Sequence, residues 1–202
     1  EWTESAHVKI ASDRSNFGGV TGLTQAESNY AFLVGCYALC KGRVEIEPKN
    51  GTDYTANAGG IAGTLANSTI AGCTVKAKNI YGHNASSPSL IGVSGIAAYV
   101  VGVSSVSDCK AYATLIRNST VLGTEDASVT PDNLFGMGMI VGIDAGTTTV
   151  TNCGVGGSFY LGASEKPQEL ILTLDADSYA KGIIGSGKTA TVGGCYYWNG
   201  EK

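Results

Sequence analysis

Residues 181–195, KGIIGSGKTATVGGC, contain the spacing G-x-x-x-x-G-K-[ST] that is typical of a phosphate-binding loop. The pattern is met by Gly182, Gly187, Lys188 and Thr189. Such a loop needs a helix directly after the Lys-Thr pair, because the amides at the helix N-terminus hold the anion. Here the chain continues as ATVGGCYYWNGEK, which favours strands and is interrupted by a Gly-Gly pair. We therefore expect no nucleotide binding.

A second candidate chemistry is cleavage of a polysaccharide by paired carboxylates. Asp175 and Asp177 stand two residues apart in a variable stretch, and two carboxyl groups can act as acid and base on a glycosidic bond. Solvated loop charges are the ordinary alternative. Tyr81, Tyr160 and Tyr179 are candidates for stacking on sugar rings, although core positions would also suit these side chains. These five residues are the candidate ligand-binding set.

The six cysteines do not form a metal-binding or catalytic pattern. No C-x-x-C pair occurs, and the two histidines, His7 and His83, lie far from the cysteines in the sequence. A nucleophilic thiol needs a neighbouring base, and no histidine accompanies any of them. We expect no catalytic residue, no cofactor and no metal site on these grounds.

The cysteines instead mark an internal repeat. Four stretches align almost without gaps: GGIAGTLANSTIAGCTVKA (59–77), SGIAAYVVGVSSVSDCKAYA (94–113), GMIVGIDAGTTTVTNCGVGG (138–157) and KGIIGSGKTATVGGCYYWN (181–199). A fifth copy runs from GGVTG (18–22) to FLVGCYALC (32–40) after a four-residue insertion. A β-branched or leucine residue stands three places before each of Cys36, Cys73, Cys109, Cys153 and Cys195. The apparent phosphate loop is thus one copy of this repeat, and its Lys188 falls in a turn.

Small residues alternate with larger ones after each repeated cysteine, as in Cys73, Val75 and Ala77. A period of two indicates one face of a strand, so the cysteines and the residues that alternate with them should point inward and form a structural ladder through stacked copies. The two residues before each cysteine favour a turn and mark a corner between short strands. The cysteines are then small buried side chains, or partners in disulfides between rungs such as Cys73 to Cys109.

Composition agrees with an all-β chain: 29 of the 202 residues are glycine, and only 15% are charged. We predict a single domain over residues 1–202, a parallel β-solenoid with a right-handed β-helix as the favoured form. It would have about five coils, with repeats at about 17–40, 59–80, 94–116, 138–160 and 181–199 and two or three strands in each. Length variation falls in residues 80–92, 116–136 and 159–179, which we expect to be lateral loops or added strands.

A β-propeller is the alternative architecture. Successive ladder cysteines are 37, 36, 44 and 42 residues apart, near the length of a four-stranded blade. The Trp-Asp signature of such blades is absent from the chain. The sequence therefore favours the solenoid.

The repeat resembles the GLUG-motif repeats of bacterial surface and adhesin-like proteins, which read GGLVG and then TI-x-N-C-Y-A-T-G. The likeness is strongest at residues 59–77 and 149–155, and departures include Ala98 in place of the last opening glycine and Tyr197 at a position that is small in other copies. The resemblance implies an exported β-solenoid segment, often part of a larger adhesin or next to a protease domain. It implies no catalytic residue.

The net charge of −4 and the lack of a Lys/Arg run argue against a nucleic-acid partner. No apolar stretch reaches the roughly 20 residues of a membrane-spanning helix. We expect a non-catalytic extracellular or cell-surface adhesion module, exported from a bacterium with its signal removed, that presents loops to a host protein or a glycan. The alternative is a carbohydrate-active β-helix enzyme, a polysaccharide lyase or glycoside hydrolase.

Overall fold

A computed structural model describes residues 7–12, 14–25, 31–48, 55–84, 90–119, 136–161, 168–170, 182–186 and 190–201. All regular secondary structure in these residues is β-strand, and no helix occurs among them. The strands form four sheets in which almost every pairing is parallel. The prediction of an all-β chain with parallel sheets is therefore confirmed.

Strands that follow one another along the chain belong to different sheets, which we call A to D. Sheet A contains β1 (His7–Ser12), β5 (Tyr37–Pro48), β9 (Thr74–Asn84), β13 (Lys110–Ser119), β17 (Gly154–Leu161), β18 (Gln168–Leu170) and β21 (Tyr196–Tyr197). Sheet B contains β2 (Arg14–Gly18), β6 (Thr55–Gly59), β10 (Leu90–Ser94) and β14 (Met137–Gly138). Sheet C contains β3 (Thr21–Gln25), β7 (Ala62–Ala66), β11 (Ala97–Val101), β15 (Val141–Asp144) and β19 (Ile184–Ser186). Sheet D contains β4 (Ala31–Val34), β8 (Ser68–Ala71), β12 (Val103–Ser107), β16 (Thr147–Thr151) and β20 (Thr191–Gly193).

Each passage of the chain through sheets B, C, D and A, in that order, is one circuit. Neighbouring strands within a sheet come from successive circuits. Among the described strands, only β17 and β18, an antiparallel pair, are consecutive strands in one sheet. The aliphatic position before each cysteine is in register through sheet D, where the stacked residues are Leu33, Ile70, Val106, Val150 and Val192. A propeller blade would instead join consecutive strands in one sheet, so the propeller alternative finds no support in this pairing.

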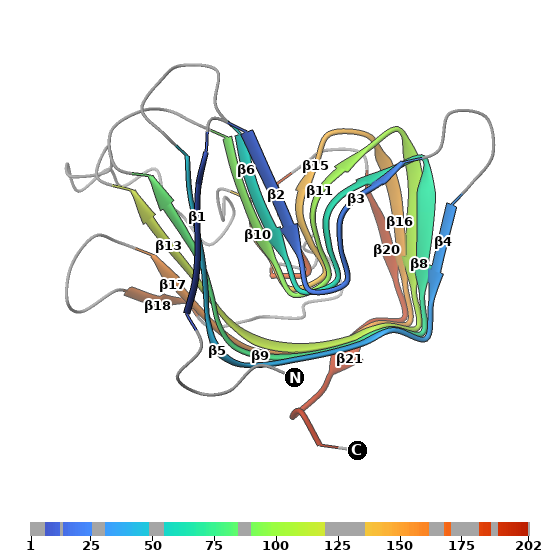
Figure 1. Cartoon of the computed structure of the whole chain (residues 1–202). Coiled ribbons are helices and arrows are strands. Elements are labelled where there is room, and N and C mark those ends of the chain that lie inside the picture. Colours follow the sequence, from blue (N-terminus) through green and yellow to red (C-terminus); the bar gives the residue numbers. More distant parts are fainter. Residues whose placement is uncertain are drawn as a thin grey trace.

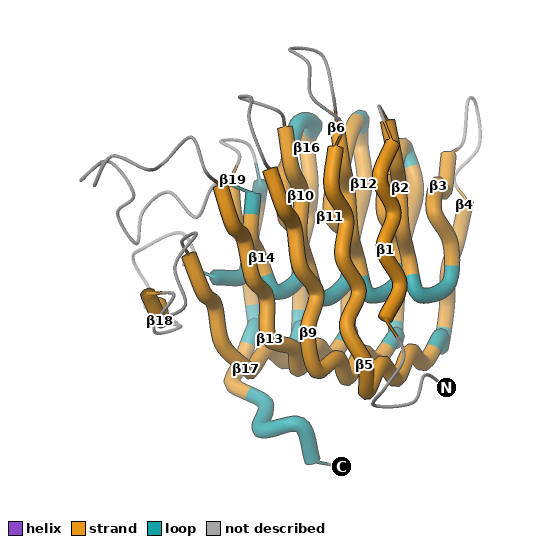
Figure 2. The backbone as a smooth tube through the Cα atoms, turned by 60° about the vertical axis from the view of Figure 1, so that its left-hand side comes forward, coloured by secondary structure: helices purple, strands orange, loops and turns teal. Residues whose placement is uncertain are grey.

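Figure 1 looks along the stack of circuits. Sheet A forms the base and curves up one side, sheet D closes the other side, and sheets B and C run next to each other between them (Figure 1). Figure 2 shows the circuits side by side, with the N-terminal circuit at one end of the stack and the C-terminal circuit at the other. The arrangement is compatible with a β-helix or solenoid.

The turn between sheets B and C rests directly on sheet A, which explains the repeated small-residue opening. A Cβ atom at Gly60 would lie 2.1 Å from the Gly95 oxygen and 2.6 Å from Cγ1 of Val75 on β9. A Cβ atom at Gly95 would lie 2.7 Å from the Cβ atom of Ala111 on β13. Only glycine fits between two backbones at this separation, so the Gly-Gly opening sets how closely the layers approach.

The corner between sheets D and A has a fixed backbone conformation. The residue before each repeated cysteine has a positive φ in the left-handed region: 66° at Gly35, 62° at Gly72, 53° at Asp108, 54° at Asn152 and 66° at Gly194. Glycine, Asn and Asp tolerate this conformation better than other residues, which accounts for the turn formers seen in the sequence. The cysteine that follows begins the passage along sheet A.

The buried apolar side chains form one contiguous cluster between the sheets. Its largest fully buried members are Phe159, Ile61, Leu65, Ile70, Ile96, Leu115, Met137, Met139, Ile140 and Ile183. The expectation that small side chains point inward after each cysteine agrees with the burial of Val75, Ala77 and Ala111. The aliphatic and small positions of the repeat therefore build a narrow core.

One sequence-based expectation needs correction, the number of strands in each circuit. A full circuit has four strands, not two or three, because sheet B was not anticipated. In the expected lateral segments the structure has added strands, one of the two expected alternatives, since β9 continues to Asn84, β10 begins at Leu90, and β13 runs to Ser119. Sheet B lacks the alternation of a half-exposed strand because residues 57–59 and 92–94 are buried on both faces between sheet C and the core.

Candidate functional site

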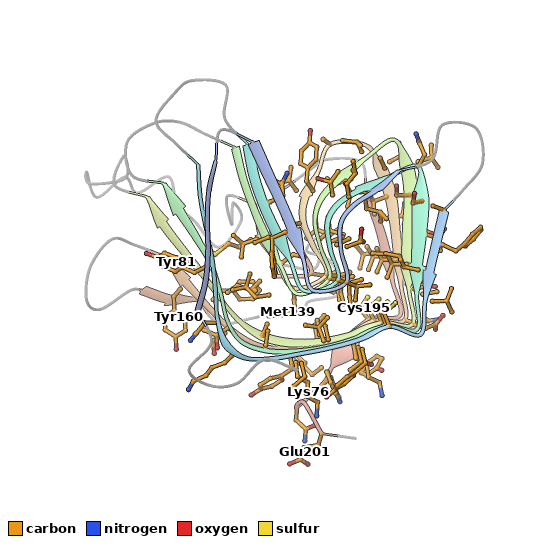
Figure 3. All side chains as sticks on the ribbon, in the orientation of Figure 1. Lys76, Tyr81, Met139, Tyr160, Cys195 and Glu201 are labelled. Atoms are coloured by element: carbon orange, nitrogen blue, oxygen red, sulfur yellow. The ribbon has the colours of Figure 1, made fainter. Side chains whose placement is uncertain are left out.

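The five repeated cysteines lie one above another where sheet D meets sheet A. Cys73, Cys109 and Cys153 are fully buried, and Cys36 and Cys195 at the two ends of the row are half-buried. All five carry free thiols. Figure 3 shows Cys195 at this corner, among the side chains that point into the stack.

The thiols supply hydrogen bonds that the corner needs. The amide of Cys36 donates to Sγ of Cys73 at 3.3 Å, and the amide of Cys73 donates to Sγ of Cys109 at 3.4 Å. Each sulfur also donates to the carbonyl two residues earlier, for example Cys109 Sγ to the Ser107 oxygen at 3.1 Å. A buried amide without an acceptor costs about 1–3 kcal/mol, so this position requires a small side chain that also accepts a hydrogen bond. Cysteine meets both needs.

Contacts between neighbouring thiols shift their pKa values in alternate directions along the row. The hydrogen bond from Cys109 lowers the pKa of Cys73 to about 6, and hydrogen bonds from Cys109 and Cys195 lower the pKa of Cys153 to about 4. Hydrogen bonding to Cys153 raises the pKa of both Cys109 and Cys195, and burial raises the pKa of Cys36. A thiolate at Cys73 or at Cys153 is thus stabilised by the S–H group of a neighbouring cysteine, which then points along the row and not at the carbonyl two residues earlier.

The outer face of sheet A carries aromatic and basic side chains. Val75 on β9 and Ala111 on β13 point inward. The residues directly before and after each of them on the same strand therefore point outward. One register column contains Tyr37, Thr74, Lys110, Gly154 and Tyr196, and the next contains Leu39, Lys76, Tyr112 and Gly156. Three of these rings are well exposed: Tyr37 at 59%, Tyr112 at 40% and Tyr196 at 44%.

Trp198 joins this face from the C-terminal segment. Its ring centroid lies 5.5 Å from Nζ of Lys76, 5.7 Å from Nζ of Lys110, and 6.5 Å from the Tyr112 ring in an edge-on arrangement. Both ammonium groups are at cation–π distance, so two successive circuits, through β9 and β13, and the C-terminal segment meet at one ring. Lys76 and the segment that ends near Glu201 appear below sheet A in Figure 3.

Two glycines in β17 make room for this segment. A Cβ atom at Gly156 would lie 2.0 Å from the Trp198 oxygen, and one at Gly154 would lie 2.9 Å from Cε2 of Tyr196. The Trp198 amide donates to the Val155 oxygen at 2.8 Å, which ties the segment to β17. On β13 the equivalent positions carry the side chains of Lys110 and Tyr112. On β17 the C-terminal segment takes the space that such side chains would fill.

We call the outward cluster of Tyr37, Lys76, Lys110, Tyr112, Tyr196 and Trp198 the Lys–aromatic face. Among the described residues, no carboxylate forms an ion pair with either of its lysines. Two ammonium groups without an ion pair to a described carboxylate therefore lie beside the Trp198 ring and can attract an anion. The Lys–aromatic face therefore offers aromatic rings on which a ligand can stack and two ammonium groups that can bind an anionic group.

The sequence-predicted candidates lie elsewhere or outside the described residues. Tyr81 and Tyr160 share one register column of sheet A with Ile116 between them, so their Cα atoms are about two strand spacings, or ~9.6 Å, apart. Both are half-buried, and Figure 3 shows them on the curved side of sheet A, pointing away from the interior. Asp175, Asp177 and Tyr179 lie outside the described residues, as does Lys188.

The sequence did not single out Lys76, Lys110 or Tyr112, although its alternation after each cysteine placed them on the solvent side. Asp144 was also not anticipated. Its carboxylate is buried and accepts hydrogen bonds from the Gly146 amide at 3.1 Å and from Oγ1 of Thr148 at 2.6 Å. These contacts shape the turn between β15 and β16, so Asp144 has a structural role.

Comparison with protein-family models, with curated proteins and with solved structures gives no match. In the described part of the chain, no group of three or more His, Cys, Asp and Glu side chains could hold a metal ion. No helix with the length and apolar character needed to cross a membrane occurs among the described residues either.

Proposed function

We propose that this chain is a non-catalytic binding module of an exported bacterial surface protein, built on a right-handed β-solenoid of about five coils. The stacking of successive circuits in parallel register supports the solenoid, and the repeat resembles the GLUG-motif repeats of surface proteins. In Figures 1 and 2 the chain turns clockwise as it recedes from the N-terminal end, which favours the right-handed form. The ligand is a host protein or a glycan, and the Lys–aromatic face favours a glycan.

The exposed rings of the Lys–aromatic face carry this proposal. Tyr37, Tyr112 and Tyr196 are 40–59% exposed on a sheet surface, although most large apolar side chains in the described part of the chain are buried. Tyrosine offers a flat apolar ring and a polar hydroxyl at one site, and aromatic side chains dominate the binding energy of many interfaces. The three rings lie on every second strand of the stack, β5, β13 and β21, about 9.6 Å from one to the next, and such a row suits a ligand that is itself a chain of repeating units.

The two lysines narrow the ligand to an acidic glycan. Lys76 and Lys110 flank Trp198 and have no carboxylate partner among the described residues. A uronate or sulfate group would supply the missing negative charge, and the attraction at such an exposed site weakens as salt is added. Ligand binding at this face needs neither the lateral loops nor any catalytic group.

A glycan array of neutral, uronate-containing and sulfated oligosaccharides tests the proposal, followed by calorimetry with the tightest binder. We expect Tyr112→Ala to raise Kd about tenfold or more, and Lys76→Gln to weaken binding of acidic members selectively. Phe32→Ala is the matched control, because Phe32 is an aromatic residue 66% exposed on the outer face of sheet D. Equal loss in the Phe32 variant, or no binder on the array, would contradict the proposal.

The catalytic alternative has a separate test. A reducing-sugar assay on the same oligosaccharides should show no release of product. Release that disappears in Asp175→Asn would replace the non-catalytic reading with a polysaccharide-cleaving enzyme.

A further inference from the structure

The row of thiols has a property that ligand binding does not use. We propose that oxidation joins the row from its two ends, forming the disulfides Cys36–Cys73 and Cys153–Cys195 and leaving Cys109 as a thiol. The inference concerns a modification site and is independent of the proposed ligand.

The stacking permits a bridge only between neighbours in the row. Equivalent residues of parallel neighbouring strands are about 4.8 Å apart, within the 4.4–6.8 Å range of Cα separations in disulfides. The flanking residues of Cys36 and Cys73 are in register on both sides, as are those of Cys153 and Cys195. Residues two circuits apart are separated by about 9.6 Å, which is too far.

Cys40, the sixth cysteine, is not in register with another cysteine among the described strands. Its register partner on β9 is Ala77. Cys36 lies four residues earlier, about 13 Å away along an extended strand, well beyond disulfide distance. Cys40 therefore stays outside the pairing.

Five thiols in a row allow two bridges at most, and access decides which two form. Cys36 and Cys195 are half-buried, whereas Cys73, Cys109 and Cys153 are fully buried. An oxidant meets the ends of the row first, so each terminal thiol pairs with its single neighbour. Those two bridges use four of the five thiols, and the unpaired one is at the centre.

A small-molecule disulfide such as glutathione disulfide supplies the oxidising equivalents. The Cys195 thiol loses its proton to solvent, its sulfur attacks one sulfur of the reagent, and one reduced thiol leaves. The Cys153 thiolate then attacks Sγ of Cys195, breaks the mixed disulfide and releases the second thiol. The net change is two protein thiols and one reagent disulfide converted into one protein disulfide and two reagent thiols. Cys36 and Cys73 react in the same order.

The electrostatics of the row agree with this order. The lowered pKa values of Cys73 and Cys153 keep the second, resolving attack supplied with thiolate at neutral pH. The raised pKa values of Cys36 and Cys195 make the first attack the slow step. Oxidation should therefore accelerate as pH rises.

Alkylation and peptide mapping test the proposal on the whole chain. The reduced, denatured protein should take up six iodoacetamide groups, one for each cysteine. After exposure of the folded protein to glutathione disulfide and then denaturation without reductant, only Cys40 and Cys109 should be alkylated, and mapping should recover the Cys36–Cys73 and Cys153–Cys195 peptides.

Two variants sharpen the result. Cys109→Ala should retain both bridges, because Cys109 takes part in neither. Cys153→Ser should leave Cys195 as a thiol or a mixed disulfide and keep Cys36–Cys73 intact. Recovery of a bridge that contains Cys109 or Cys40, or of fewer than two bridges in the wild-type protein, would overturn the proposal. The wild-type map alone decides the question if a variant fails to fold.

Discussion

Gly60→Ala is the substitution that tests most directly how the circuits are packed. The new Cβ atom would be placed 2.1 Å from the Gly95 oxygen of the next circuit and 2.6 Å from Cγ1 of Val75. Val75 is buried and β-branched and has both methyl groups against the new atom, at 2.6 and 3.0 Å, so it has little freedom to rotate away, and the first contact is to backbone. The turn of the neighbouring circuit must therefore move by about 1 Å to restore an ordinary contact distance.

The cost follows from these contacts. Inserting a methyl group into a well-packed site costs about 1–3 kcal/mol, and a clash with backbone on a rigid sheet belongs at the upper end of that range. The displacement also weakens the hydrogen bond from the Gly60 amide to the Ser94 oxygen, now 3.1 Å long, for about 1 kcal/mol more. We expect the free energy of unfolding to fall by about 4 kcal/mol.

Urea unfolding followed by circular dichroism measures this loss. With a slope of roughly 2 kcal/mol per molar urea, the midpoint should fall by about 2 M. Gly193→Ala is the matched control, because no heavy atom lies within 4 Å of its added Cβ and its φ is not positive. The Gly193→Ala variant should change the free energy of unfolding by about 1 kcal/mol or less, and a small increase is the expected sign. Equal midpoints for the two variants would refute the idea that the turn is pressed onto sheet A.

Two further substitutions test local parts of the structure. Asp144→Ala removes the acceptor of the Gly146 amide and of Thr148 Oγ1 and should cost about 2 kcal/mol in urea unfolding, so an unchanged midpoint would argue against a structural role for this carboxylate. Truncation after Cys195 removes Trp198 with its two cation–π contacts and its edge-on ring contact, together worth roughly 2–3 kcal/mol, and should lower Tm by about 4–12 °C. A truncated chain that stays monomeric with the wild-type Tm would show that this segment does not cover sheet A.

The sequence predicts the parts of the fold that have one buried and one open face. Ile70 and Val106 alternate with polar neighbours in sheet D, and the same period follows Cys73 into sheet A, so both strands could be found from their pattern. Sheet B could not, because residues such as Asn57 and Gly92 are enclosed on both sides and show no alternation. Its position depends on the close approach of sheet C, which is a tertiary effect.

The candidate site is predictable only in its separate pieces. Alternation places Lys76 and Tyr112 on the solvent side of sheet A, but their proximity to Trp198 depends on the C-terminal segment lying over β17. Gly154 and Gly156 permit that path, yet in the sequence they look like two more glycines in a glycine-rich chain. The shared register column of Tyr81 and Tyr160 was equally out of reach of the sequence, because it is defined only once the strands of sheet A are paired.

Because the circuits stack one on the next, the number of repeats determines how far the outer surface of sheet A extends along the stack. Residues 73–108 span 36 residues, from one repeated cysteine to the residue before the next. A tandem duplication of this cassette, inserted before Cys109, would keep every column in register and add one strand spacing, about 4.8 Å, to the sheet. Each added cassette would also repeat Lys76 in its column, so the charge of the surface would grow in proportion to its length.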